Sequence, residues 1–263
     1  MLQILGASVL LGMVSGVLAG LFGIGGGLVI VPVLLLLFTY QGFSLDHVMV
    51  MAVATSLATI MLTALASIWA HHRLGSMLWQ KVLALLPGIL LGSILGAYLG
   101  HFLSSDVLRI IFIVFLLYVG LKMALQLEPK AGRLRESKLQ DAAVAILIGV
   151  VSALIGIGGG TMTVPYLVRS QYSMRHAVAV SCACGLPIAI GATLSYVVLG
   201  WRQPELPEWS LGYVYLPAFL AIGFSSLFTA PLGAKLAHRL PAKKLKKYFS
   251  VLLFLMAAKM IWG

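Results

Sequence analysis

The sequence is poor in charged residues, and acidic residues are the scarcest of them. Only 10% of the 263 residues are charged, with 7 Asp and Glu against 18 Lys and Arg. A soluble domain usually has about 25% charged residues. Apolar residues make up 61% of the chain, and mean hydropathy is +1.05. One globular core cannot hide that much apolar surface, so the sequence predicts a multi-pass membrane protein and excludes a secreted enzyme or a nucleic-acid-binding domain.

Cysteine is also scarce, because the chain has only 2. Cys182 and Cys184 lie two residues apart in an apolar run, where a helix would point them to different faces. They form neither a disulfide framework nor a zinc motif, and we predict no metal and no cofactor. The net charge of +11 is expected to lie in cytoplasmic loops, as Lys and Arg do in membrane proteins, and not to bind nucleic acid. The first residues lack a basic n-region, so we interpret them as a retained membrane segment.

The chain contains an internal repeat. Gly-Ile-Gly-Gly-Gly occurs at 23–27 and again at 156–160, and each copy leads into a Val-Pro pair. A second match aligns 96–123 with 233–260 without gaps. Two matches in the same order predict two related halves. The predicted domains are residues 1–127 (first membrane repeat), 128–139 (basic cytoplasmic linker) and 140–263 (second membrane repeat).

The basic residues also predict how the segments cross the membrane. With the linker inside, each half consists of a hairpin (1–40 or 140–170) followed by three crossings. The predicted crossings are 47–70, 82–101, 106–127, 176–200, 212–236 and 248–263. Each half crosses an odd number of times, so the second half is inverted and both termini are outside. The predicted fold is an all-α polytopic protein of two inverted-topology repeats, each a Gly-interrupted hairpin plus three transmembrane helices. The number of crossings in each half is odd whether the hairpins span the membrane or are partly re-entrant. The short segment 27–40 favours a partly re-entrant hairpin.

The paired glycine segments are the main candidate site. Three glycines in a row weaken a helix, and unwound backbone at membrane depth is tolerated where it is buried by protein or lines a cavity. Matching interruptions in two halves indicate a binding site, and a helix that restarts there points its positive end at an anion. The predicted substrate-binding glycines are Gly25, Gly26, Gly27, Gly158, Gly159 and Gly160. Pro32 and Pro165 are the predicted helix-kink or hinge residues. The alternative is that the glycines serve only close helix packing.

Small polar side chains near the middle of the crossings are candidate donors to the same substrate. Thr55 and Ser56 occupy the position in the first half that Cys184 and Gly185 occupy in the second. Thr161 follows the second glycine run. We predict that Thr55, Ser56, Thr161 and Cys184 bind substrate, with bonding to the chain's own helix carbonyls as the alternative for the hydroxyls.

The acids indicate the sign of the substrate. All seven lie at predicted helix ends or in loops, whereas cation paths and proton relays normally need an intramembrane Asp or Glu. An anionic substrate is therefore favoured. His71, His72 and Arg73 at the start of an inside loop are candidate gating or proton-coupling residues, with a surface or helix-cap role as the alternative. No nucleophile, base and metal ligands converge within the membrane, so we predict no catalytic residues and no enzyme.

The sequence resembles the TauE/SafE family, also called the 4-toluene sulfonate uptake permease family. The resemblance rests on six segments: the glycine segments 23–32 and 156–165, Ala54-Thr55-Ser56, the stretch His71–Gly75, and the Gly-Ala pairs at 96–97 and 233–234. It implies a bacterial inner-membrane permease that exports sulfite or an organosulfonate such as sulfoacetate. One departure is that Cys184-Gly185 stands where the first half has Thr55-Ser56.

The predicted function is a secondary transporter that exports a small sulfur-containing anion by alternating access, as a uniporter or with proton exchange. The predicted partners are this small anion and the lipid bilayer, and the oligomeric state is left open between monomer and homodimer. The alternatives are a permease for another small anion or metabolite and a non-transporting membrane scaffold or biogenesis factor.

Overall fold

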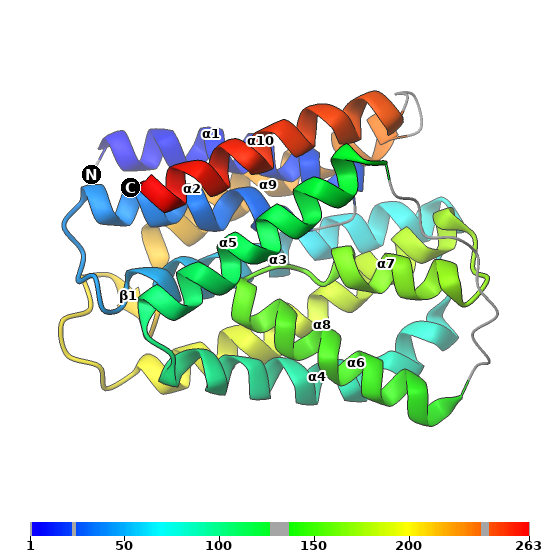
Figure 1. Ribbon diagram of the computed structural model, residues 1–263, viewed down its shortest axis with the longest axis horizontal. Helices are drawn as coiled ribbons and strands as arrows, with labels where there is room; N and C mark the ends of the chain where they lie inside the picture. The colour runs from blue at the N-terminus through cyan, green and yellow to red at the C-terminus, as the bar shows by residue number, and fades with distance from the viewer. Residues whose placement is uncertain (1, 23–24, 127–136, 238–241, 263) are drawn as a thin grey trace.

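The computed structural model describes residues 2–22, 25–126, 137–237 and 242–262, which form ten helices and one short β-hairpin (Figure 1). The helices of the first half are α1 (Leu2–Phe22), α2 (Gly27–Tyr40), α3 (Val48–Arg73), α4 (Trp79–Phe102) and α5 (Ser105–Ala124). Those of the second half are α6 (Lys138–Ile155), α7 (Gly160–Arg169), α8 (Met174–Gly200), α9 (Leu216–Ala237) and α10 (Ala242–Trp262). Strands β1 (Ser210–Leu211) and β2 (Val214–Tyr215) pair in antiparallel fashion before α9.

The prediction of a helical, multi-pass membrane protein is confirmed. Among the described residues, six helices are long and apolar enough to cross a membrane: α3, α4, α5, α6, α8 and the part of α9 up to Gly233. By contrast, α2 has 14 residues and α7 has 10, whereas a crossing needs about 20. Each Gly-interrupted hairpin thus joins a long helix, α1 or α6, to a helix that is too short to cross alone.

Helices α3 and α8 form the centre of the molecule and pack against each other. In the most apolar 18 residues of each helix, 83% of α3 and 78% of α8 are buried, against 28% of α5. Large apolar side chains such as Leu83, Val114 and Phe228 are exposed on the outer helices. Lipid is the solvent in which such exposure costs little, so these side chains face the bilayer.

The outer helices pack in pairs that join the two halves. Helix α1 lies along α9, α6 lies along α4, and α5 lies along α10. The α4–α6 pair is especially close, because a methyl group at Gly92 would overlap the carbonyl oxygen of Ile146. The pairing is reciprocal. The first helix of each half, α1 or α6, packs on the fourth helix of the other half, α9 or α4.

The two ends of the bundle differ. At one end, here called the linker end, α3 and α5 finish and α4 and α6 begin (Figure 1). The other end contains the end of α4, the β-hairpin and both ends of the chain. It is here called the hairpin end, after the β-hairpin. The α1–α2 pair opens toward the hairpin end, whereas the α6–α7 pair opens toward the linker end (Figure 1).

Candidate functional site

The glycine segments interrupt their helices at left-handed residues. Gly25 and Gly26 have φ of +74° and +79°, and α2 begins immediately after them. In the second half, Gly156 ends α6 with φ of +77°, and Gly159 precedes α7 with φ of +74°. Side chains other than hydrogen rarely adopt this region, so glycine is needed where the chain turns back. Of the first copy of the motif, residues 23 and 24 lie outside the described residues.

The two glycine segments meet backbone to backbone in the middle of the molecule. A methyl group added to Gly25 would lie 3.3 Å from the Cα atom of Gly158. One added to Gly27 would overlap the carbonyl oxygen of Gly156. Because a side chain at Gly27 would overlap backbone and the left-handed Gly25 has little room beside Gly158, the glycines permit both the turn within each half and the contact between the halves.

A small cavity lies beside this contact. It is lined by Ala19, Gly25, Ile60, Thr63, Ala64, Ser67, Gly158, Cys182 and Gly185. The cavity has room for about one water molecule. Four of these residues lie on one face of α3, which runs from the glycine contact toward the linker end. The wall therefore combines glycine backbone with two hydroxyls and one thiol, all neutral.

The predicted polar residues lie close to the glycine contact but make different contacts. Ser56 donates a hydrogen bond of 2.8 Å from Oγ to the carbonyl oxygen of Gly156, so it ties α3 to the second glycine segment. Thr55 accepts a hydrogen bond of 3.0 Å from the backbone N–H of Tyr215, the last residue of β2. The hydroxyl of Thr161 is buried and makes no hydrogen bond among the described residues.

The thiol on the cavity wall is that of Cys182, whereas Cys184 is fully buried and does not line the cavity. Together with Thr63 and Ser67, Cys182 belongs to the residues that the sequence interpretation missed. A signal for the two hydroxyls was present, because Ser56, Thr63 and Ser67 recur at helical spacing on one face of α3. The two prolines lie within their predicted helices, Pro32 in α2 and Pro165 in α7.

The residues predicted for gating lie at the linker end and do not line the cavity. His71 is buried, and its Nδ1 lies 3.3 Å from the hydroxyl of Ser76. The ring of His72 packs edge-on against Trp79, and the guanidinium of Arg73 lies 3.9 Å from the centre of the Trp69 ring. These contacts organise the turn between α3 and α4.

An aromatic cluster closes the hairpin end of the α3–α8 centre. Tyr213, in the turn between β1 and β2, is buried against the ring of Tyr196, and its hydroxyl lies 3.0 Å from Nδ1 of His101. Burial raises the pKa of Tyr213, so its hydroxyl stays protonated and can donate to the imidazole. The predicted crossing 212–236 is corrected here, because its first residues pair with β1 and α9 begins only at Leu216.

Buried charge is present at the linker end. The Nζ atom of Lys81 lies 2.8 and 3.1 Å from the two carboxylate oxygens of Asp141, in the first turns of α4 and α6. Asp141 lies at a helix end, as expected for all seven acids, whereas Lys81 falls just outside the predicted crossing 82–101 and is in fact a buried residue of α4. Pairing with Asp141 explains how a Lys can be buried here. Within the described part of the chain, no three His, Cys, Asp or Glu side chains gather as metal ligands.

We expect Ser56→Ala to destabilise the protein by about 1–3 kcal/mol, because it leaves the buried Gly156 carbonyl without its side-chain donor. Unfolding in mixed detergent measures the change. Ser195→Ala is the matched control, since the Ser195 hydroxyl bonds only to Gly191 of its own helix, and it should cost less than 0.5 kcal/mol, about the usual limit for such sites. Equal losses for both variants would contradict a special role for Ser56.

Comparison with known proteins supports the resemblance in the glycine motifs. Residues 8–260 match the family model described as Sulfite exporter TauE/SafE. A probable membrane transporter protein of Haemophilus influenzae is 40% identical over 252 residues, covering 95% of this chain and 96% of that protein. Another, of Methanocaldococcus jannaschii, is 28% identical over 255 residues, covering 96% and 94%. No solved structure matches the chain. The match over nearly all of the sequence shows that the protein belongs to the TauE/SafE family and is a membrane transporter of that type.

Proposed function

We propose that the protein is a secondary carrier for a small sulfur-containing anion, sulfite or an organosulfonate such as sulfoacetate, and that it works by alternating access. The observation that carries the proposal is the contact between Gly25 and Gly158 at the starts of two short helices, beside a neutral polar cavity. The alternatives are another small anion or metabolite as substrate and a scaffold that transports nothing.

The chemistry of the contact suits an anion. The first N–H groups of α2 and α7 have no partner within their own helices, and each helix start carries a partial positive charge. Both starts follow directly on the glycines that meet. The cavity wall adds the thiol of Cys182 and no carboxylate, while the Thr63 hydroxyl donates to the carbonyl oxygen of Ile60 in its own helix. A cation would find only carbonyl and hydroxyl oxygens there, whereas an anion finds donors and dipoles.

The arrangement of the helices supports alternating access between two inverted halves, residues 1–127 and 140–263. The halves pack reciprocally, and their glycine hairpins open toward opposite ends of the bundle (Figure 1). Inverted repeats with a site between them are a common plan of secondary transporters. The linker 128–139 lies mostly outside the described residues.

Charge favours the linker end as the cytoplasmic side of a bacterial inner membrane, with both chain ends in the periplasm. Arg73, Arg169 and Arg175 lie at the linker end, whereas Glu205 and Glu208 lie at the hairpin end. Cytoplasmic loops collect basic residues. In this orientation an inside-negative potential drives a monovalent anion outward with about 2.3 kcal/mol per 100 mV, so export needs no pump.

Flux through reconstituted protein tests this proposal. We expect liposomes that contain the protein to release labelled sulfite or sulfoacetate at a saturable rate, and Gly159→Val to reduce that rate to the protein-free level. The added side chain would lie 2.6 Å from Cδ1 of Ile188 on a left-handed backbone. Saturable flux of a different anion alone would show that the substrate proposed here is wrong and that the other anion is transported. No flux of any anion or metabolite would favour the non-transporting scaffold.

A further inference from the structure

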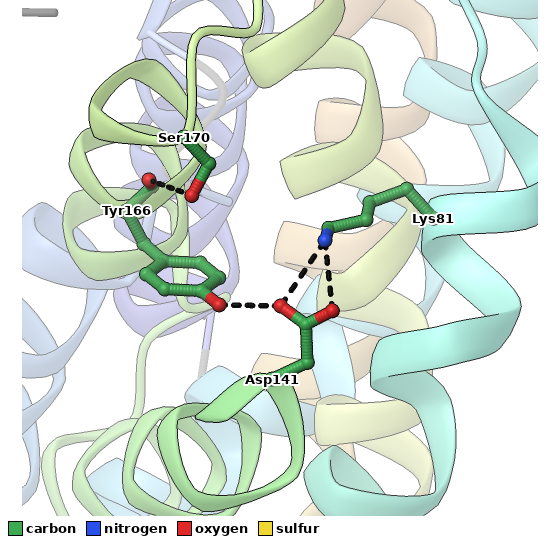
Figure 2. Close-up of polar contacts among 4 residues, drawn as sticks. All are labelled: Lys81, Asp141, Tyr166 and Ser170. Atoms are coloured by element: carbon green, nitrogen blue, oxygen red, sulfur yellow. Dashed lines mark hydrogen bonds and ion pairs between the residues drawn. The ribbon is translucent and has the colours of Figure 1, made fainter. Parts of the chain in front are cut away.

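The charged cluster at the linker end reaches from the outer helices to the candidate site. Asp141 of α6 binds Lys81 of α4 through both oxygens and also accepts a hydrogen bond from the hydroxyl of Tyr166 in α7 (Figure 2). The side chains of Lys81 and Asp141 are only 8% and 12% exposed. The ring of Tyr172, just after α7, lies 5.4 Å from Nζ of Lys81. Three helices thus converge on one carboxylate.

Stability alone does not account for this cluster. A buried ion pair contributes little to stability compared with apolar residues of the same size, because both charges lose their hydration. The α4–α6 pair is already held by close packing along Gly88 and Gly92, where an added methyl group would touch α6. What the ion pair adds is an acceptor for Tyr166, and therefore a link from the α4–α6 pair to α7.

Helix α7 is the element that such a link can position. It has 10 residues, starts after the left-handed Gly159, and is followed by Gln171 with φ of +68°. Pro165 removes one backbone hydrogen bond within it. Tyr166 lies seven residues beyond Gly159, about 10 Å along the axis. A hold at Tyr166 therefore sets the direction of α7 and, through it, the direction of the N–H groups beside the glycine contact.

The described residues of the first half contain no equivalent cluster. In the alignment of the two glycine motifs, Val33 of α2 corresponds to Tyr166, and Ser8 of α1 corresponds to Asp141. Helix α2 is instead held by buried apolar side chains, among them Leu28, Ile30 and Leu34. Among the described residues, the side-chain hydrogen bond from Tyr166 to Asp141 thus holds α7, whereas apolar packing holds α2.

We propose that Lys81, Asp141 and Tyr166 form a positioning latch, in which the ion pair holds the Tyr166 hydroxyl and so keeps the start of α7 aimed at the substrate beside Gly158. This inference rests on the proposed anion site. The three residues act through α7 and do not line the cavity. Release of Tyr166 lets α7 tilt about Gly159, which weakens anion binding and loosens the cavity.

Tyr166→Phe tests the latch because it removes only the hydroxyl. We expect the KM for sulfite in proteoliposomes to rise about tenfold, the scale of a lost hydrogen bond to a charged group, while the maximal rate changes less. A small thiol reagent should modify Cys182, on the cavity wall, several-fold faster, as read by mass spectrometry. The control is Ser170→Ala, which removes a 3.1 Å bond to the Tyr166 carbonyl without touching Asp141 and should leave both values unchanged.

A second variant separates positioning from folding. The triple variant K81M, D141L and Y166F replaces the cluster with apolar side chains of similar size, which is expected to keep the fold stable. Its melting temperature should stay near the wild-type value while KM and Cys182 modification change as in Tyr166→Phe. A folded triple variant with wild-type KM and wild-type Cys182 labelling would overturn the latch. The latch would also be overturned if Ser170→Ala changed both values as much as Tyr166→Phe does. Cys182 labelling needs no substrate, so a failure of sulfite flux in the wild type would remove the proposed function and leave this test intact.

Discussion

Gly27→Val is expected to abolish transport while the protein still inserts into the membrane. Gly27 is the first residue of α2, and a side chain there would overlap the Gly156 carbonyl and lie 3.0 Å from the Cα atom of Ile157. Both neighbours are backbone and cannot rotate away. The two glycine segments would be forced apart, and we expect a loss of flux of about a hundredfold, the scale that a 1 Å displacement causes in enzyme sites.

The measurement is anion flux per protein molecule in proteoliposomes, with the amount of protein in the membrane fraction as the test of insertion. Gly6→Val is the matched control. It makes the same change in α1, where an added methyl group meets nothing within 4 Å, and it should retain wild-type flux. Wild-type flux in Gly27→Val would show that the close contact of the two segments is not needed for transport.

The second large effect is expected from Asp141→Leu, which leaves Lys81 buried without its carboxylate. Breaking a buried pair by removing one partner costs about 3–5 kcal/mol, because the remaining charge loses its compensation. We expect a large drop in unfolding free energy in mixed detergent. The Tyr166 hydroxyl also loses its acceptor, which adds to the cost.

Adding Lys81→Met to Asp141→Leu should restore most of the lost stability, because the charge left behind is removed as well. Comparing the unfolding free energies of the single and double variants separates the cost of the unpaired charge from the cost of the lost packing. If the double variant were as unstable as Asp141→Leu, the loss would come from shape and not from charge. A stable single variant would show that water reaches Lys81 despite its 8% exposure.

Several features of the fold could be predicted because they depend on local sequence. Long apolar runs predicted the helices. The positions of the basic residues predicted which helix ends lie on the same side of the membrane. The repeated glycines predicted where the helices break, since a left-handed residue such as Gly26 or Gly159 favours glycine whatever surrounds it. The short β-hairpin was not predicted, because its strands have two residues each and a span of apolar sequence follows them directly.

The sequence places its candidate site at the two glycine segments and at four polar side chains, and the structure shows how these residues lie relative to one another. The glycines of both segments do meet, and Ser56 lies on them. Thr55 instead bonds to Tyr215 at the end of β2, and the thiol on the cavity wall belongs to Cys182. The partners of Thr55 and Ser56 lie in the other half of the chain, where no local pattern points to them.

The sequence by itself determined the membrane setting, the helices, the breaks at the glycines and the family. Only the tertiary structure decided which face of each helix turns inward, and hence the choice between Cys182 and Cys184 and the pairing of Lys81 with Asp141. The physical reason is that in lipid both the inside and the outside of a helix are apolar, so the sequence carries little of the periodicity that orients helices in water. Close packing along glycines decides the orientation instead, and that packing exists only once the helices have assembled.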